Sequence, residues 1–373
     1  MIELQKTRCL LCSLMCGIAA EVQEGNVRNF DYLESKPPCR GKICARGHYL
    51  KEIYAHPKRL LAAGVRADEG FQHVTWDEAL KVAKTKLSRV MKARDGVSIG
   101  IILSGNSSSE ESYLASVLAR EIIQTNYIAS SASIEDLSLL EGLYNSDLAL
   151  ASAKLNSLKK CDHFLIVGDV FHRHPPLARF IQQCKFANRR NVKVVVVDSR
   201  KSATSWFADT HLQPVPGTDT ALFLQLAFAL HDRQGKEKAP KQVLQVFKYL
   251  KKAGLPDLEK ITGVNQSAIA TAAQALCSGS HGAVLVTGGF GALAGGTVAV
   301  NALNLAAHLG GVERKILPLF TYGNSSGVFA VGQSIRNETK SGKDTYVPLA
   351  GIVKAVMNHE LHGLLVFGED LLA

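Results

Sequence analysis

The stretch Cys9-Leu10-Leu11-Cys12-Ser13-Leu14-Met15-Cys16 decides how the chain begins, and a fourth cysteine, Cys44, follows in residues 41–47. The spacing is C-x2-C-x3-C-x27-C. Three thiols within eight residues, joined by one from a distant loop, suit the corners of a [4Fe–4S] cluster. Zinc also binds four thiolates, but its ligands usually come as two similar short knuckles, and here the second half is a lone cysteine. The sequence therefore predicts a [4Fe–4S] cluster on Cys9, Cys12, Cys16 and Cys44, with zinc as the alternative.

The remaining cysteines do not form a disulfide framework. Five of the eight cysteines crowd into the first 44 residues and the rest are scattered. Cys161, Cys184 and Cys277 are typical of small buried apolar side chains. Cys39 lies five residues before Cys44 and competes with it as the fourth ligand on spacing alone.

Length and charge narrow the class of protein. A chain of 373 residues is longer than one ordinary core, so we expect two or three domains. The net charge of +10 is spread over dispersed Lys and Arg without a nucleic-acid-binding motif, which favours a basic surface facing a partner subunit and no nucleic acid. No apolar stretch is long enough to cross a bilayer, and no secretory signal is visible. We expect a cytoplasmic protein.

Alternating strand and helix signals follow the cysteine region. A hairpin is predicted over residues 18–27, with Gly25 and Asn26 in the turn. Capping boxes at Thr75–Glu78 and Ser108–Glu111 begin two helices. Continuous apolar runs that end in Gly, Asp or Ser predict buried parallel strands, whose carboxyl ends bind ligands. These runs are residues 98–103, 164–168, 192–198, 283–288 and 364–368.

The predicted fold class is α/β, a small cluster module followed by Rossmann-like units with parallel sheets. We expect a [4Fe–4S] module over residues 1–60. One α/β domain is expected to combine residues 61–150 with 310–373. A nucleotide-binding type of α/β domain is expected over residues 151–309.

Several motifs resemble the molybdopterin oxidoreductase superfamily, which includes formate dehydrogenases and the large iron–sulfur subunit of respiratory complex I. In that family the fourth cysteine is followed by x-Lys/Arg-Gly, as Cys44 is followed by Ala45-Arg46-Gly47, so the resemblance selects Cys44 over Cys39. The resemblance covers essentially the whole chain. Its other motifs are residues 56–60, 75–80, 168–171, 174–175, 198–200, 216–222, 261–264 and 288–296.

The resemblance implies a second cofactor, a molybdopterin guanine dinucleotide with molybdenum or tungsten. A glycine lets the backbone approach a phosphate, carboxylates accept hydrogen bonds from ribose or guanine, and arginine pairs with phosphate. Arg46 matches the cation that lies between cluster and pterin in catalytic relatives. The alternative is that these strand-end residues only form turns and helix caps. The matching cofactor-binding positions are Arg46, Gly168, Asp198, Arg200, Gly217, Thr218 and Asp219.

Three features depart from the catalytic relatives. Those relatives carry a Cys, selenocysteine, Ser or Asp metal ligand after a segment like residues 125–128, whereas residues 129–136 here hold no cysteine and offer only Ser130, Ser131, Ser133 and two acids. The family's Gly-x-Asn-Pro is Gly168-Asp169-Val170-Phe171, and the apolar side chain and bulky ring threaten the nucleotide pocket. The sequence ends at Ala373, so we expect the domain that closes over the second pterin to be absent or on another chain.

Three functions remain open. The first is an iron–sulfur electron-transfer and scaffold subunit of a multi-subunit redox complex, without its own molybdenum ligand. Its partners would be iron–sulfur, flavin or hydrogenase subunits. The second is the catalytic Mo/W-pterin subunit of a split formate or formylmethanofuran dehydrogenase, with the closing domain on a partner chain. The third is a non-redox scaffold of a formyltransferase/hydrolase complex, which the intact cysteine quartet disfavours.

Overall fold

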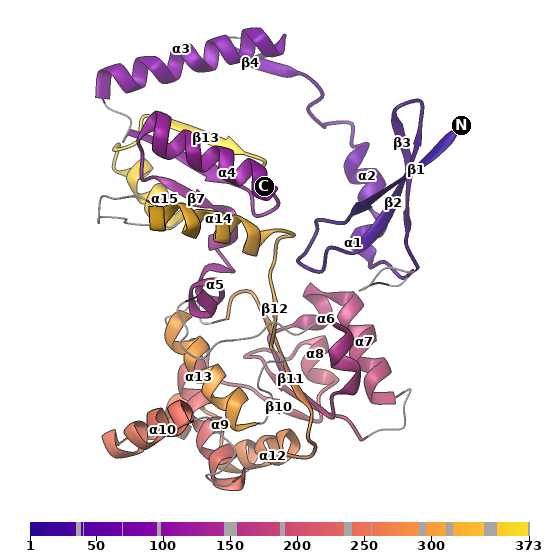
Figure 1. The fold of residues 1–373 in the computed structure, drawn as a ribbon, viewed down its shortest axis with the longest axis vertical. Helices are drawn as coiled ribbons and strands as arrows, with labels where there is room; N and C mark the ends of the chain where they lie inside the picture. Colours follow the sequence, from indigo (N-terminus) through magenta and orange to yellow (C-terminus); the bar gives the residue numbers. More distant parts are fainter. Residues whose placement is uncertain are drawn as a thin grey trace.

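The computed structural model describes residues 1–34, 39, 41–68, 70–94, 98–144, 155–186, 191–234, 241–254, 256–290, 296–310, 316–338 and 349–371. Two α/β units are stacked along the long axis, and the N-terminal module lies beside the place where they meet (Figure 1). In the described part, no helix has the length and apolar character needed to cross a membrane.

The N-terminal module is a three-stranded antiparallel sheet with two short helices. The order is β1-β2-β3, and the predicted hairpin is confirmed as β2 and β3. Its turn lies at Glu24 and Gly25, one residue earlier than expected, because Asn26 already pairs with Gln23 at the start of β3. The first strand had no sequence signal because all of its side chains are exposed. The elements are β1 (Ile2–Arg8), β2 (Gly17–Gln23), β3 (Asn26–Tyr32), α1 (Ala45–His48) and α2 (Leu50–Tyr54).

A five-stranded parallel sheet forms the larger α/β unit. Its order is β10-β9-β8-β11-β12, so the chain proceeds outward in opposite directions from the pair β8 and β11. The strands are β8 (His163–Val167), β9 (Lys193–Val197), β10 (Thr210–Leu212), β11 (Gly282–Thr287) and β12 (Ile316–Leu319). Such a reversal opens a crevice at the carboxyl ends of the two central strands.

Helices cover both faces of this sheet because its strands are apolar on both sides. In β8, Leu165 and Val167 belong to one core, whereas Phe164 and Ile166 belong to the other. Each such side chain contributes roughly 1.5–3 kcal/mol on burial. The first core is shared with α9 (Asp219–Gln234), α12 (Gln266–Leu276) and α13 (Gly296–Leu309); the second with α6 (Val170–Arg173) and α7 (Pro175–Phe186). The remaining helices of this unit are η4 (Leu155–Lys160), α8 (Ala203–Trp206), α10 (Lys241–Ala253) and α11 (Leu258–Thr262).

The smaller α/β unit has a parallel sheet of order β13-β6-β7. Its elements include β6 (Ile99–Leu103), α4 (Ser109–Val117), η2 (Leu118–Ile123), β7 (Ile128–Ser130), η3 (Ser131–Ser133), α14 (Ser325–Glu338), α15 (Leu349–Met357) and β13 (Gly363–Phe367). The capping box predicted at Ser108 and Glu111 is present at the start of α4. The five strands predicted from apolar runs are all present, as β6, β8, β9, β11 and β13. The expectation of burial is wrong for β13, because it lies at the edge of its sheet and its side chains are partly exposed.

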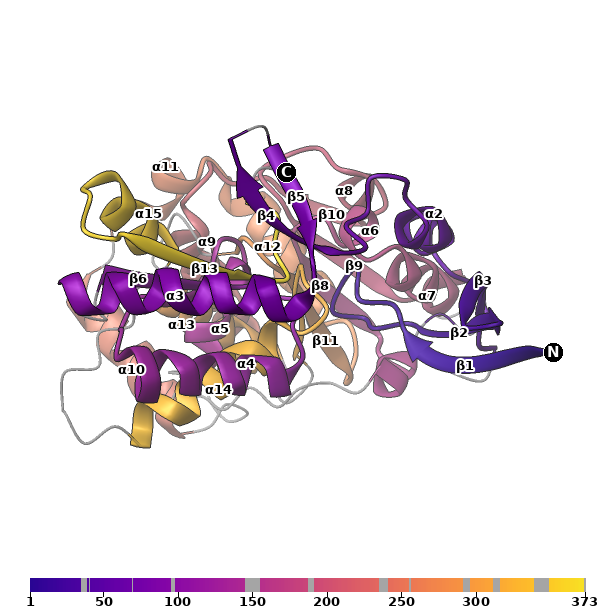
Figure 2. The same ribbon diagram turned by 90° about the horizontal axis from the view of Figure 1, so that it is seen from above.

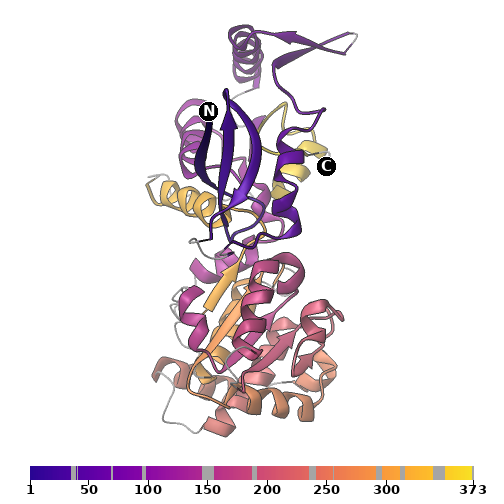
Figure 3. The same cartoon turned by 90° about the vertical axis from the view of Figure 1, so that its right-hand side faces the viewer.

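A hairpin and one long helix project at the end of the smaller unit. They are β4 (Ala63–Ala67), β5 (Gly70–Val74) and α3 (Trp76–Arg94). Thr75 and Glu78 form the predicted capping box, with Glu78 N donating to Thr75 Oγ1 at 3.3 Å. Figure 2 looks down on α3, and Figure 3 shows the hairpin reaching away from the rest of the molecule. The second half of α3 packs on the core beside β6 through Leu87, Val90 and Met91.

The division of the two units differs from the expected boundaries at 150 and 309. The helix α5 (Leu137–Tyr144) places Leu139 and Leu140 in the core of the larger unit. Likewise β12 pairs with β11. Both elements lie next to the crossings between the units, and their packing partners, rather than their sequence neighbours, decide where they belong.

Candidate functional site: a cysteine pocket beside a charged crevice

The antiparallel pairing of β1 with β2 brings the first and third cysteines together. Cys9 follows β1 and Cys16 precedes β2, and Cys9 N donates to Cys16 O at 2.9 Å. Between them a tight loop, with Met15 at φ 45°, carries Cys12. Cys44 arrives separately as the residue that precedes α1. Cys9, Cys12 and Cys16 are buried, and Cys44 is half-buried.

The electrostatics of this pocket suit a metal cluster. Burial raises the pKa of the Cys9, Cys12 and Cys16 thiols, and neighbouring cysteines raise the pKa of each further. Buried thiolates that repel one another need compensating positive charge, which iron supplies. Among the described residues, no three His, Cys, Asp or Glu side chains are placed to hold a single metal ion. The four cysteines are the donor set that a [4Fe–4S] cluster uses, and zinc accepts the same donors.

Arg46 connects the cysteine loop to the larger α/β unit. Its Nη1 donates to Leu11 O at 3.3 Å, and its Nη2 donates to Arg173 O at the end of α6. The guanidinium also lowers the pKa of Cys9 and Cys12, acting against the larger effect of burial. Arg46 therefore lies between the cysteine loop and the crevice, and its role as a cation between cluster and pterin stays a prediction.

Two cavities lie at the carboxyl end of the five-stranded sheet. One of about 240 Å³ is lined by the sequence-predicted Gly168, Asp198, Arg200, Gly217 and Asp219. The other, of about 530 Å³, is lined by Arg46. Both share Asp169, Arg173 and Arg200, so they adjoin. Thr218 does not line either cavity; its Oγ1 donates to Val215 O at 2.7 Å, where it helps to begin α9.

The smaller cavity has features of a nucleotide crevice. Gly168 has φ 86°, and a Cβ there would stand 2.1 Å from Thr287 Oγ1, so only glycine brings β8 and β11 this close. Asp198 is 8% exposed; its Oδ1 accepts from Arg200 N at 3.0 Å. Its other oxygen, Oδ2, is buried without a hydrogen-bond donor among the described residues. A buried acceptor of this kind fits a ligand that donates a hydrogen bond, such as a ribose hydroxyl or a guanine N–H.

The expected obstruction by Val170 and Phe171 is not present. Val170 is fully buried in the second core of the sheet, and neither side chain lines a cavity described above. The ring of Phe171 instead packs against Phe207, with centroids 5.2 Å apart. The Asp169 carboxylate turns the chain by accepting from Thr204 Oγ1 at 2.7 Å and from His172 N at 3.3 Å. The side chains of Val170 and Phe171, which replace Asn and Pro of the family turn, therefore pack away from the crevice and do not fill it.

In the segment expected to carry a metal ligand, Glu135 reaches the larger cavity. Ser130 Oγ accepts from Ala132 N at 3.2 Å, and Ser131 Oγ accepts from Gly105 N at 3.1 Å. Ser133 Oγ is buried and has no partner within the described residues. None of these three serines lines the larger cavity, whereas Glu135 does.

The Glu135 carboxylate is held by two partners. It forms an ion pair with Arg173 and accepts from Thr321 Oγ1 at 2.7 Å. Burial raises its pKa, but Arg173 and Thr321 outweigh that effect and leave the pKa lowered. Sequence reasoning named only the acids of this segment as a group, because the contacts with Arg173 and Thr321 join positions far apart in the chain.

The neighbouring Asp136 is fully buried, and unlike Glu135 it does not line the larger cavity. It accepts from Ser325 Oγ at 2.6 Å and from Thr321 N at 3.0 Å. Burial raises its pKa more than these hydrogen bonds lower it. His174 is equally buried, and its Nε2 is 3.1 Å from Phe320 O.

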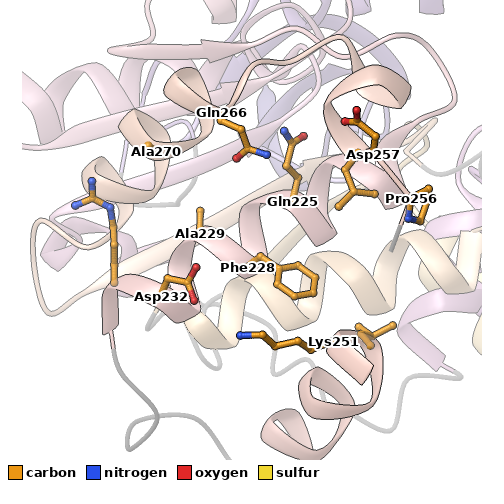
Figure 4. Close-up of a pocket in the computed structure, with 12 residues that line it drawn as sticks. Gln225, Phe228, Ala229, Asp232, Lys251, Pro256, Asp257, Gln266 and Ala270 are labelled. Carbon is orange, nitrogen blue, oxygen red and sulfur yellow. The ribbon is translucent and has the colours of Figure 1, made fainter. Parts of the chain in front are cut away.

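A third cavity, of about 560 Å³, lies among α9, α10, α11 and α12 (Figure 4). The buried Gln225 on its wall donates to Val264 O at 2.9 Å and accepts from Thr262 Oγ1 at 3.1 Å. Its carboxamide is therefore satisfied by the protein itself. No sequence-predicted site residue lines this cavity.

Comparisons with known proteins agree with these observations. The model of the molybdopterin oxidoreductase Fe4S4 domain matches residues 2–56, and that of molybdopterin oxidoreductase matches residues 49–370. An F420-dependent formate dehydrogenase subunit alpha from Methanocaldococcus jannaschii is 26% identical over 343 residues, 88% of this chain and 50% of the relative. The F420-dependent formate dehydrogenase 2 subunit alpha of Methanococcus maripaludis is 30% identical over 58% of this chain and 31% of its own length.

Among solved structures, acetylene hydratase from Pelobacter acetylenicus has a TM-score of 0.63 at 20% identity, over 82% of this chain and 43% of that one. This likeness concerns the fold alone. The chain spans half or less of the length of these relatives. The two family models together extend from residue 2 to residue 370, and the cysteine pocket lies within the first. The chain therefore belongs to the molybdopterin oxidoreductase family and carries its Fe4S4 domain.

Proposed function

We propose that this chain is an iron–sulfur electron-transfer and scaffold subunit of a multi-subunit redox complex, without a molybdenum ligand of its own. The observation that carries the proposal is that the Glu135 carboxylate is already engaged by other residues of the chain. Of the segment expected to supply a metal ligand, Glu135 lines the cavity beside Arg46, and it is engaged by Arg173 and Thr321. Both contacts are made by Oε2, so they orient the carboxylate and neutralise its charge, and that oxygen can bind a metal only if Arg173 and Thr321 release it.

The cluster supplies one-electron transfer when it is bound in the cysteine pocket. Arg46 connects that pocket to the larger α/β unit and so lies on a route for electron transfer. Arg46 touches the cysteine loop at Leu11 and the end of α6 at Arg173, and it lines the cavity of about 530 Å³. Its positive charge stabilises the reduced, more negative cluster. We expect the electron partners to be iron–sulfur, flavin or hydrogenase-type subunits.

A second candidate is the catalytic subunit of a split formate or formylmethanofuran dehydrogenase. The open crevice favours it, because the two adjoining cavities extend from Arg46 to Gly217, and the free oxygen of Asp198 faces no donor among the described residues. Those residues would hold a pterin dinucleotide, with Asp198 on its donor groups and Arg200 on its phosphates. In that case Glu135 would bind metal through Oε1, or through Oε2 after its release from Arg173.

Elemental analysis of the anaerobically purified native complex distinguishes the candidates. The measurement is iron, molybdenum and tungsten per copy of this chain, after subtraction of the cofactors on other subunits. About four iron atoms without molybdenum or tungsten are expected for an electron-transfer subunit. Stoichiometric molybdenum or tungsten would refute that proposal and support the catalytic candidate, and absence of iron would refute both.

Nucleotide release provides an independent check on the crevice. Acid hydrolysis of a bound pterin guanine dinucleotide liberates GMP, which chromatography quantifies. The electron-transfer proposal expects no GMP. If GMP is found, Asp198→Ala should abolish it, whereas Asp257→Ala, at an exposed helix cap outside the crevice, should not.

A further inference from the structure

The strand β13 leaves one edge of the smaller sheet open. The order of that sheet is β13-β6-β7, and no strand of the described residues pairs with the outer side of β13. Phe367 O accepts from the N–H of Ser104, the residue after β6, at 2.9 Å, so Phe367 turns its backbone groups toward β6. Backbone groups alternate in direction along a strand. Leu364 and Val366 therefore turn their N–H and C=O groups to the open edge, where a further strand can pair with them.

The open edge is apolar and carries none of the features that keep strand edges apart. Leu364 and Val366 are 40% and 38% exposed. Residues 363–367 are Gly-Leu-Leu-Val-Phe, without a charge or a proline, and their pairing with β6 runs without a bulge. Edges that face water in native proteins are usually blunted by lysine, proline or a bulge. The edge of β13 is therefore typical of one that is covered in the assembled protein.

The apolar surface continues from β13 onto α15. Leu364 and Ile352 of α15 lie on the same face of the sheet, because a Cβ added to Gly100 of β6 would contact both. Val366 lies on this face too, since side chains two residues apart in a strand share a face. Ile352 is buried, but α15 also carries an exposed apolar stripe with the spacing i, i+3, i+4, which consists of Val353, Val356 and Met357. An occupant of the edge thus needs apolar side chains on the α15 face.

We propose that the open edge of β13 binds a strand of a different polypeptide, parallel to β13 and with apolar side chains on the α15 face. All pairs in this sheet are parallel. Purely parallel sheets are over-represented relative to random pairing and are covered on both faces. A second copy of this chain, related by a two-fold axis, would instead pair β13 with itself in antiparallel order. The parallel order therefore favours a partner that is not a copy of this chain.

The longer relatives indicate the kind of partner. The part matched by this chain is 50% of the formate dehydrogenase subunit from Methanocaldococcus jannaschii and 43% of acetylene hydratase. Each of those single chains therefore has residues beyond the matched part that can cover such an edge. We expect the partner of this chain to supply the equivalent, an α/β polypeptide whose edge strand is rich in valine, isoleucine and leucine. The inference rests on the proposed function only in requiring a complex with a second polypeptide.

Hydrogen exchange of the native complex, read at single amides by mass spectrometry, tests whether the edge is covered. The Leu364 amide points to the open edge and the Leu365 amide points to β6, so the two neighbours serve as probe and internal control. Two variants of the full chain, purified with its partners, disturb the edge. Val366→Pro removes an outward N–H and spares the hydrogen bonds to β6. Val366→Lys keeps the N–H and places a charge at the edge.

We expect the Leu364 amide of the wild-type complex to be as protected as that of Leu365. In both Val366 variants the Leu364 amide should exchange at least about tenfold faster, because the strand that pairs with it is lost. The Leu365 amide should stay protected, which shows that the smaller unit is folded. Native mass spectrometry should show the loss of one subunit from these complexes. Val298→Lys, at an exposed valine of α13 in the larger unit, is the matched control and should keep every subunit.

Three results would overturn the inference. A Leu364 amide that exchanges freely in the wild-type complex would mean that the edge is bare. A full set of subunits in both Val366 variants would mean that no partner strand is held at this edge. Loss of a second copy of this chain, in place of a different polypeptide, would make the edge a homodimer interface. Where Val366→Pro loses the protection at Leu365, Val366→Lys decides between these results.

This inference and the electron-transfer proposal can fail separately. Stoichiometric molybdenum or tungsten would refute the electron-transfer proposal and leave the partner strand in place. A bare edge in an iron-loaded complex without molybdenum or tungsten would refute this inference alone.

Discussion

At position 168 both the backbone conformation and the space available require glycine. Gly168 follows the last residue of β8 at φ 86°, and an added Cβ would stand 2.1 Å from Thr287 Oγ1. Gly25 has a similar φ of 76° in the β2–β3 turn, but nothing lies within 4 Å of its added Cβ. The two glycines share the backbone requirement, and only Gly168 adds a steric one. A comparison of the two therefore separates backbone strain from close approach.

Gly168→Ala should destabilise the protein more than Gly25→Ala. The left-handed backbone costs an alanine about 1–2 kcal/mol at either position. The contact with Thr287 adds about 1–3 kcal/mol for overpacking at Gly168 alone. Urea unfolding of both variants measures the difference in the free energy of unfolding. Equal costs would mean that β8 and β11 separate easily and that the crevice is not held at this width.

Among the secondary-structure elements, those that bury a continuous apolar face were predictable and those that depend on distant partners were not. The run Val194–Val197 predicts a buried strand by composition alone, and Ser108 with Glu111 marks a helix start through local hydrogen bonds. In contrast, β12 carries Pro318 and a short apolar stretch, so its pairing with β11 had no local signal.

The same reasoning explains the candidate site. Five of the seven predicted cofactor positions line one cavity because strand ends gather at one edge of a parallel sheet. The ion pair of Glu135 with Arg173 joins residues 38 positions apart, so no local pattern in the sequence predicts it. The direction of Phe171 was likewise decided by a distant partner, Phe207.

The junction of α6 and α7 carries a buried histidine that should make stability depend on pH. Burial lowers the pKa of His174 to about 4. Its Nε2 is bonded to Phe320 O, and Nδ1 is buried without a partner among the described residues, so a second proton finds no acceptor. Between pH 6.5, near the pKa of an unfolded histidine, and about 4, the unfolded chain therefore binds a proton that the folded chain does not.

Stability should consequently fall as the pH is lowered from about 6.5 to about 4, by about 3 kcal/mol from His174 alone. His174→Gln can keep a donor to Phe320 O but does not titrate. Urea unfolding at several pH values should give a smaller loss in the variant than in the wild type. Parallel curves for the two proteins would show that His174 is protonated in the folded state or is solvated there.

At the scale of the whole molecule, the chain passes between the two α/β units at residues 131–137 and again at 320–325, and the N-terminal module joins them at the second crossing. Asp136 of the first crossing accepts from Thr321 and Ser325 of the second. Phe320 N donates to Ser13 Oγ of the cysteine loop at 2.9 Å, and Ser13 N donates back to Phe320 O at 3.3 Å. Cluster module, crevice and smaller unit thus meet around one buried carboxylate.

Asp136→Ala should uncouple the two units. It leaves the Thr321 N–H and the Ser325 hydroxyl without their acceptor in the interior, at a cost of about 1–3 kcal/mol for each unsatisfied group. The lost contacts join the two crossings and do not belong to either core. Calorimetry should therefore resolve two unfolding transitions in the variant, whereas the wild type should unfold in a single, more cooperative transition. Asp257→Ala, which removes an exposed helix cap and its surface ion pair with Lys260, should cost about 1 kcal/mol and leave the shape of the transition unchanged. A single, uniformly shifted transition in Asp136→Ala would mean that the packing of the three modules, and not this carboxylate, sets the geometry between cluster and crevice.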